Sequence, residues 1–127
     1  MLFRSRVLLA EDNQVNQLVA SRMLSRRGYQ VDIAANGAVA LELARQHRYA
    51  VIFMDCQMPV LDGYQATLEI RRGETGRRVP IVAMTADVRT EDRQRCREVG
   101  MDGYLGKPFT GEALDTALAE LPVRMPG

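Results

Sequence analysis

The sequence predicts an α/β fold, a single domain in which five helices cover both faces of a doubly wound, five-stranded parallel sheet. Three observations support this prediction. The chain has 127 residues, which suits one domain with a real hydrophobic core. Short apolar runs alternate with segments of helical periodicity. The connections between them are short, which is typical of βαβ units whose right-handed crossovers leave few possible topologies.

The predicted strands are short apolar runs, as expected for strands that are buried on both faces of a parallel sheet. The third run is the clearest, because Val-Ile-Phe-Met leads directly into Asp55 and a turn with Pro59 and Gly63 follows. The second run alternates only weakly between apolar and polar residues. The predicted strands cover residues 7–10, 30–34, 51–55, 79–84 and 101–105.

The predicted helices begin after turn residues and end near glycine or proline. Asn13 is a good N-cap for the first helix, and Gly28 follows its end. Pro122 ends the last helix, and the residues after it form a frayed tail. The fourth helix has few large apolar residues, which predicts loose packing. The predicted helices cover about residues 14–27, 37–45, 64–72, 88–99 and 111–121.

Composition and charge argue against several classes of function. The formal net charge of +1 argues against direct binding of nucleic acid. No apolar run approaches the length of a membrane span and no signal peptide is recognisable, so we expect no membrane contact by this domain. Cys56 and Cys96 lack the spacing of metal ligands, which favours a reduced, cytoplasmic location.

Polar side chains follow four of the predicted strands where these strands end. They are Glu11 and Asp12 after the first strand, Asp55 in the third, Thr85 after the fourth, and Lys107, the chain's only lysine, after the fifth. The carboxyl ends of such strands share one edge of the sheet, where ligands bind. Three adjacent carboxylates repel each other unless a cation is present, and Mg²⁺ prefers oxygen ligands. Together with a hydroxyl group and an ammonium group, this arrangement favours phosphoryl transfer.

The same residues belong to motifs by which the chain resembles the receiver (CheY-like) domain of response regulators. The resemblance covers nearly the whole chain and implies a flavodoxin-like strand order of 2-1-3-4-5, with a receiver domain at residues 1–122 and a C-terminal tail at 123–127. The segments at residues 11–17 and 55–59 are most similar to receivers of hybrid histidine kinases. The motifs are Glu-Asp-Asn at 11–13, Met-Asp at 54–55, Met-Pro-Val-Leu-Asp-Gly at 58–63, Met-Thr-Ala at 84–86 and Gly-Tyr-Leu-Gly-Lys-Pro-Phe at 103–109.

The resemblance implies a role for each residue of the site. Asp55 would be the nucleophile that accepts a phosphoryl group from a phosphohistidine. Asp12 and Asp55 would bind Mg²⁺ (or Mn²⁺) directly, together with the backbone carbonyl of Gln57, and Glu11 would act through water. Lys107 would pair first with Asp55 and then with a phosphoryl oxygen. The domain would catalyse only its own phosphorylation and dephosphorylation.

Further residues would bind the phosphoryl group or transmit the signal. The Thr85 hydroxyl and the backbone amides of Cys56 and Ala86 would bind phosphoryl oxygens. Thr85 and Tyr104 would then switch the surface formed by the fourth helix, the fifth strand and the fifth helix. Asp87 would add negative charge near the site. The implied partners are a histidine kinase or a histidine phosphotransfer domain, and a downstream protein target or attached domain.

Other interpretations remain open at this stage. A haloacid-dehalogenase-type phosphatase also uses an Asp nucleophile, but it needs a second Asp two positions later, where this chain has Gln57. A flavodoxin-type flavin binder needs a phosphate loop after the first strand, where Glu11 and Asp12 would repel phosphate. A stand-alone single-domain response regulator is an alternative to a hybrid kinase, and so is a pseudo-receiver that binds partners without being phosphorylated.

Overall fold

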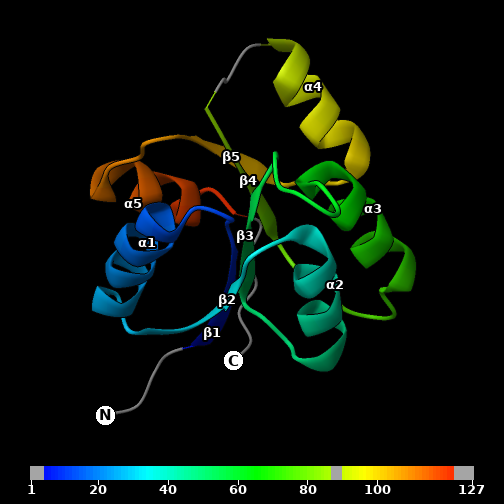
Figure 1. Cartoon of the computed structure of the whole chain (residues 1–127), viewed down its shortest axis with the longest axis horizontal. Helices are drawn as coiled ribbons and strands as arrows, with labels where there is room; N and C mark the ends of the chain where they lie inside the picture. The colour runs from blue at the N-terminus through cyan, green and yellow to red at the C-terminus, as the bar shows by residue number, and fades with distance from the viewer. Residues whose placement is uncertain (1–4, 87–89, 122–127) are drawn as a thin grey trace.

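Five parallel strands form one sheet in the computed structural model, which describes residues 5–86 and 90–121 (Figure 1). The strand order is β2-β1-β3-β4-β5. This confirms the predicted fold class and the strand order implied by the resemblance. The strands are β1 (Ser5–Ala10), β2 (Tyr29–Ala34), β3 (Val51–Asp55), β4 (Ile81–Thr85) and β5 (Gly103–Gly106).

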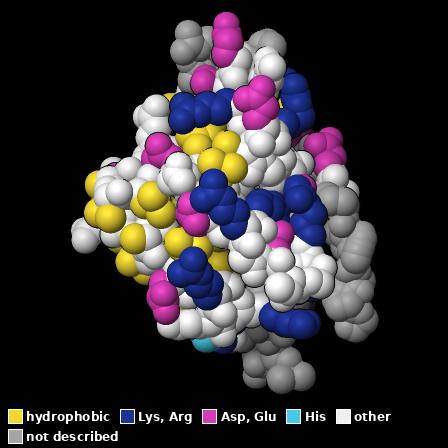
Figure 2. Space-filling view, turned by 90° about the vertical axis from the view of Figure 1, so that its right-hand side faces the viewer, with side chains coloured by type: hydrophobic (Ala, Val, Ile, Leu, Met, Phe, Trp, Pro, Cys, Tyr) yellow, Lys and Arg dark blue, Asp and Glu magenta, His cyan; other side chains and the backbone are white. Residues whose placement is uncertain are grey.

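Helices cover both faces of the sheet, with α1 and α5 on one face and α2, α3 and α4 on the other (Figure 1). Figure 2 shows the second of these sides, where basic and acidic side chains are mixed over the surface. No helix within the described ranges is both long enough and apolar enough to cross a membrane. The helices are α1 (Gln14–Arg26), α2 (Gly37–Gln46), α3 (Gly63–Gly73), α4 (Thr90–Val99) and α5 (Gly111–Ala119).

The apolar runs form two core layers, one on each face of the sheet. Val7 and Leu9 of β1 pack toward α1 and α5, whereas Leu8 and Ala10 pack toward the other helices. All of β3 is buried, as expected for a central strand of a parallel sheet. This burial on both faces explains why the strands appear in the sequence as continuous apolar runs.

Local residues fix where the elements begin. The side chains of the N-cap residues Asn13, Asn36, Asp62 and Thr110 each accept a hydrogen bond from the backbone N–H three residues later. The predicted fourth strand begins too early, because Pro80 has no N–H to donate to the sheet and β4 starts at Ile81.

The fifth strand lies later in the chain than the predicted residues 101–105, since the ladder with β4 runs from Gly103 to Gly106. Residues 87–89 and 122–127 lie outside the described residues. These ranges include Asp87, the predicted start of the fourth helix and the predicted C-terminal tail.

Helix α4 is held to the core by few apolar side chains, as the sequence predicts. Cys96 alone is buried among the α4 side chains that the structure describes, and Val99 is half-buried. Two arginines of α4 instead stack on aromatic rings, Arg93 on Tyr104 and Arg95 on Tyr64. The attachment of α4 therefore depends on one small core residue and on surface contacts.

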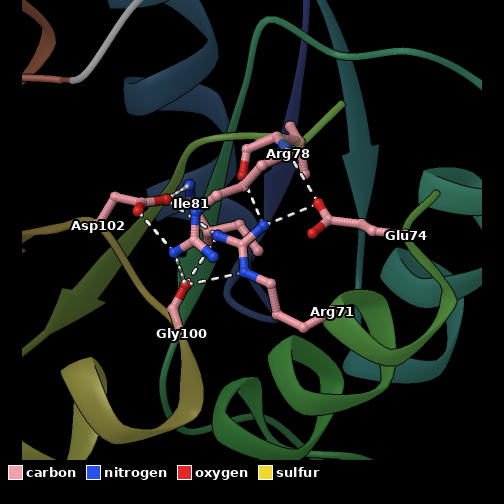
Figure 3. Close-up of polar contacts among 7 residues, drawn as sticks. Arg71, Glu74, Arg78, Ile81, Gly100 and Asp102 are labelled. Carbon is pink, nitrogen blue, oxygen red and sulfur yellow. Dashed lines mark hydrogen bonds and ion pairs between the residues drawn. The ribbon is translucent and has the colours of Figure 1, made fainter. Parts of the chain in front are cut away.

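Arg71 joins three elements at the start of β4 (Figure 3). Its guanidinium donates to the Gly100 carbonyl at 2.7 and 2.9 Å and pairs with Glu74 at 2.8 Å and Asp102 at 2.9 Å. Asp102 also accepts a hydrogen bond from the backbone N–H of Ile81 at 2.9 Å. The ends of α3 and α4 are thus tied to the first residue of β4 by one largely buried network.

We predict that Arg71→Met lowers the free energy of unfolding by about 2 kcal/mol, because the largely buried Glu74 loses its charged partner, and Asp102 and the Gly100 carbonyl keep only the Arg78 guanidinium as a charged partner. Arg72→Met is the matched control, since the Arg72 side chain is 68% exposed and its ion pair with Glu69 contributes less than about 1 kcal/mol. Urea unfolding of both variants measures the difference. Equal losses would show that the network does not stabilise the fold.

Candidate functional site

The carboxyl ends of the strands surround a polar cavity of about 450 Å³. All of the predicted site residues except Tyr104 line it. The topology explains this convergence, because β1 and β3 are neighbours at the sheet centre and β4 and β5 follow on one side. The predicted residues in its wall are Glu11, Asp12, Asp55, Cys56, Gln57, Thr85, Ala86 and Lys107.

A second cavity of similar size, about 470 Å³, lies between α2 and the end of α3. The two acidic residues in its wall, Glu69 and Glu74, are ion-paired with Arg72 and Arg71. Volume alone therefore does not identify the functional site. The convergence of carboxylates with a lysine distinguishes the cavity at the strand ends.

Three carboxylates form a compact cluster in the first cavity. Glu11, Asp12 and Asp55 each provide an oxygen atom, and these atoms lie within 4.8 Å of one another. Glu11 and Asp55 are buried, at 1% and 4% exposure, whereas Asp12 is exposed. Carboxylate oxygens with one side open to water suit an ion such as Mg²⁺, which keeps several water ligands. The donor set therefore fits a small divalent cation.

Lys107 bridges two of these carboxylates. Its Nζ atom lies 3.1 Å from Glu11 Oε1 and 3.1 Å from Asp55 Oδ2. The peptide bond between Lys107 and Pro108 is cis, and the Lys107 N–H donates to the Thr85 carbonyl at 2.8 Å. Burial acts to lower the pKa of Lys107, but its contacts with Glu11 and Asp55 outweigh burial and raise it.

Backbone N–H groups also donate hydrogen bonds to the two buried carboxylates. The Gln57 N–H donates to Asp55 Oδ1 at 3.0 Å, and the Asn13 N–H donates to Glu11 Oε2 at 3.1 Å. The Cys56 N–H, which the resemblance assigns to a phosphoryl oxygen, donates to the Met84 carbonyl at 3.0 Å and so extends the ladder between β3 and β4.

The resemblance implied a role in metal binding only for the Gln57 carbonyl, so the hydrogen bond from the Gln57 N–H to Asp55 was not predicted. The signal was present, because an Asp at the start of a turn commonly accepts a hydrogen bond from the backbone N–H two residues later.

The surroundings shift the pKa values of the two buried carboxyl groups in opposite directions. Burial raises the pKa of Asp55 to about 6, and the charge of Glu11 contributes, although the Gln57 N–H and Lys107 act in the opposite direction. Burial also acts to raise the pKa of Glu11, but hydrogen bonds from Lys107 and the Asn13 N–H lower it overall. A proton shared within the cluster therefore resides mainly on Asp55, and a bound cation would favour its ionised form.

The remaining predicted residues lie at the ends of β4 and β5. Thr85 is half-buried in the cavity wall beside the exposed Ala86. Tyr104 in β5 is half-buried outside the cavity, with the Arg93 guanidinium 4.8 Å from its ring centroid. No role was predicted for Arg93, because a contact between a helix and a neighbouring strand leaves no local pattern in the sequence.

Comparison with known proteins adds independent evidence. The sequence pattern of the response regulator receiver domain family matches residues 7–119. The hybrid signal transduction protein dokA of Dictyostelium discoideum is 42% identical over 115 residues, which cover 90% of this chain but only 7% of that protein.

Two solved structures are also similar. The receiver domain of the sensor histidine kinase PA1611 from Pseudomonas aeruginosa, solved with a magnesium ion coordinated in its active site cleft, is 49% identical with a TM-score of 0.85 over 92% of this chain and 96% of that one. The co-crystal structure of the Saccharomyces cerevisiae phosphotransfer protein Ypd1 with the receiver domain of Ssk1 matches at 30% identity and a TM-score of 0.85, over 95% and 90% of the two chains.

The match extends over most of the chain in both sequence and structure, and it decides against the phosphatase and flavin-binding interpretations. The chain belongs to the response regulator receiver domain family.

Proposed function

We propose that this domain accepts a phosphoryl group on Asp55 from a phosphohistidine in a two-component phosphorelay. The observation that carries the proposal is the contact of the buried Asp55 carboxylate with Lys107 inside a cluster of three carboxylates. An Asp55 oxygen forms a bond to phosphorus while the phosphorus–nitrogen bond of the donor breaks, and the histidine nitrogen leaves with the electron pair. Water later hydrolyses the acyl phosphate and restores Asp55.

Asp12, Asp55 and Glu11 would hold Mg²⁺ (or Mn²⁺), with the Gln57 carbonyl as a further candidate ligand. The magnesium ion in the active site cleft of the PA1611 receiver supports this assignment. The bound ion would supply positive charge that keeps Asp55 ionised and offsets charge on the phosphoryl oxygens. Lys107 would move from Asp55 to a phosphoryl oxygen, while Asp55 loses one negative charge by forming the acyl phosphate.

The Thr85 hydroxyl group and the backbone N–H groups of Ala86 and Cys56 would bind the other phosphoryl oxygens. The Cys56 N–H would first have to leave the Met84 carbonyl, to which it donates in this structure. We further propose that phosphorylation of Asp55 moves Thr85 and Tyr104, and that these movements alter the surface formed by α4, β5 and α5. The few apolar contacts of α4 support this assignment, because a helix held by one buried side chain shifts at low cost.

The phosphodonor would dock on α1. Val15, Leu18 and Val19 of this helix are 69%, 51% and 48% exposed, although they are apolar. The helix starts one residue after Asn13, at the rim of the site, so a protein that covers α1 can bring a histidine to Asp55. The Ypd1–Ssk1 complex supports a histidine phosphotransfer protein as the partner. Burial of an apolar patch rimmed by polar residues would stabilise such a complex.

The domain would be one part of a larger hybrid histidine kinase. The similarity to dokA and to the PA1611 receiver supports this assignment. We assign residues 1–122 to the receiver domain and 123–127 to a tail, and place the domain in the cytoplasm, where its free cysteines stay reduced. A downstream protein or an attached domain would read the phosphorylated state.

We expect acetyl phosphate to add one phosphoryl group to the wild-type domain in the presence of Mg²⁺, and none to Asp55→Asn, which lacks a nucleophilic carboxylate. Intact mass spectrometry measures the gain. Asp115→Asn is the control, because this carboxylate on α5 lies outside the cavity and is 61% exposed, so the gain should persist. A folded wild-type domain that binds Mg²⁺ but gains no mass would favour the pseudo-receiver interpretation.

Binding of Mg²⁺ should depend on Asp12, because removal of one charge from the cluster weakens its attraction for a cation. Calorimetric titration with Mg²⁺ should show strongly reduced affinity in Asp12→Asn. Asp92→Asn provides the control, since Asp92 lines the same cavity but is not part of the carboxylate cluster. Equal effects of the two substitutions would place the ion elsewhere in the cavity.

Leu18→Asp should slow phosphotransfer from phosphorylated Ypd1 by about tenfold, or about 1.4 kcal/mol, because it places a charge in the apolar docking surface. Phosphorylation by acetyl phosphate should be unchanged, since this donor needs no docking. Val39→Asp on α2 is the matched control, as Val39 is an exposed apolar helix residue away from α1, at 41% exposure. A loss with both donors would mean that Leu18→Asp damages the site itself.

A further inference from the structure

Gln17 of α1 is tied to the segment that carries two of the three clustered carboxylates. The Nε2 atom of its side-chain amide donates to the backbone carbonyl of Glu11 at 2.7 Å. Its backbone N–H donates to the carbonyl of Asn13 at 2.9 Å. Gln17 therefore binds both ends of the segment from residue 11 to residue 13, in the middle of which Asp12 lies. The Gln17 side chain itself does not line the cavity at the strand ends.

Asp12 is the member of the carboxylate cluster with the fewest contacts of its own. Its side chain is exposed, and within the part of the chain that the structure describes its carboxylate accepts no hydrogen bond and forms no ion pair. Glu11 and Asp55, in contrast, each contact Lys107 and a backbone N–H group. The position of the Asp12 carboxylate is therefore set by the backbone on either side of it.

The two peptide groups that flank Asp12 are both held by hydrogen bonds. A peptide group is planar, so a hydrogen bond to its oxygen or from its N–H group restricts the orientation of the whole group. Gln17 binds the oxygen of the peptide group that precedes Asp12. The N–H of the following peptide group, which belongs to Asn13, donates to the Glu11 carboxylate. Both backbone dihedral angles of Asp12 are restricted as a result.

The geometry of this segment matters because of the kind of ion that fits the cluster. Mg²⁺ requires a nearly octahedral arrangement of ligands at short distances, so a displaced carboxylate binds it poorly. Removal of a group that holds a metal ligand in place typically lowers metal affinity by about 10- to 100-fold. The hydrogen bond from α1 to the Glu11 carbonyl is such a restraint on Asp12.

We propose that Gln17 is a positioning residue for the divalent cation, and that its hydrogen bond to the Glu11 carbonyl holds Asp12 where it can bind Mg²⁺. This inference rests on the proposed function, in which Asp12 is a metal ligand. Gln17 acts through the backbone of residues 11–13 and is not itself a ligand.

The first test replaces the side-chain donor. Gln17→Met removes the N–H group but keeps a long, unbranched side chain with good helix propensity. Calorimetric titration should show an affinity for Mg²⁺ about tenfold lower than in the wild type. Gln14→Met makes the same change in the same helix, at an exposed position that does not line the cavity, and should leave the affinity unchanged. Equal affinities of the wild type and Gln17→Met would overturn the proposal.

Gln17→Glu separates the effect of the hydrogen bond from that of charge. A carboxylate of the same shape cannot donate to the Glu11 carbonyl, although its negative charge attracts a cation. We expect an affinity for Mg²⁺ below that of the wild type. An affinity equal to or above that of the wild type would show that local charge sets the binding, and would overturn the proposal. Circular dichroism checks the fold of both variants, and if one of them is unfolded the other decides.

Phosphorylation by acetyl phosphate gives a result that a purely structural role would not produce. In Gln17→Met, the Mg²⁺ concentration that gives the half-maximal rate should rise by about tenfold. The rate at saturating Mg²⁺ should stay close to that of the wild type, because Asp55 and Lys107 are unchanged. A lower rate at saturating Mg²⁺ with an unchanged half-maximal concentration would contradict the positioning role.

Amide exchange without Mg²⁺ tests the restraint directly. The Asn13 N–H should exchange faster in Gln17→Met than in the wild type, because the segment that carries its acceptor is held less firmly. Unchanged exchange would overturn the proposal.

The measurements also separate this inference from the proposed function. A folded wild type that binds Mg²⁺ but is not phosphorylated would overturn the proposed function alone, since calorimetry still decides on Gln17. A folded wild type that binds no Mg²⁺ would overturn both. A wild type that is phosphorylated, with the same affinity for Mg²⁺ as Gln17→Met, would overturn only the role of Gln17.

Discussion

The sharing of one ammonium group between two buried carboxylates is the constraint on which the site depends. Glu11 and Asp55 both leave water on folding, and an isolated buried carboxylate is costly. Lys107 contacts both, and the N–H groups of Asn13 and Gln57 each donate to one of them. Burial nevertheless raises the pKa of Asp55, and the charge of Glu11 adds to the effect, because two negative charges share one ammonium group. This residual imbalance makes the site receptive to a cation.

The fold must bring several backbones close together to build this cluster. Gly63 shows how tight the arrangement is, because a Cβ atom at this position would lie 2.1 Å from the Asp55 carbonyl oxygen. Only glycine therefore allows α3 to start directly beside the end of β3. Asp62 fixes the other end of the turn that follows the site. It is the N-cap of α3, and its side chain accepts a hydrogen bond from the Gln65 N–H. The loop between Asp55 and α3 is thus fixed at both ends.

Much of this arrangement could be predicted from the sequence, because the features that define it are local. An apolar run that ends in Asp55 fixes both the strand and the position of the carboxylate at the edge of the sheet. Features that depend on contacts between distant segments could not be predicted. The network of Arg71 and the stacking of Arg93 on Tyr104 each join residues whose proximity is decided only by tertiary packing.

Helix α4 differs from the rest of the structure in how it is held. At the other end of β4, Arg71 binds Gly100 and Asp102 in the segment directly after α4 and so fixes that end of the helix. Along its length, Cys96 is the only buried side chain among those of α4 that the structure describes, and two arginines stack on aromatic rings at its surface. A helix fixed at its end and weakly held along its length can pivot with little loss of burial.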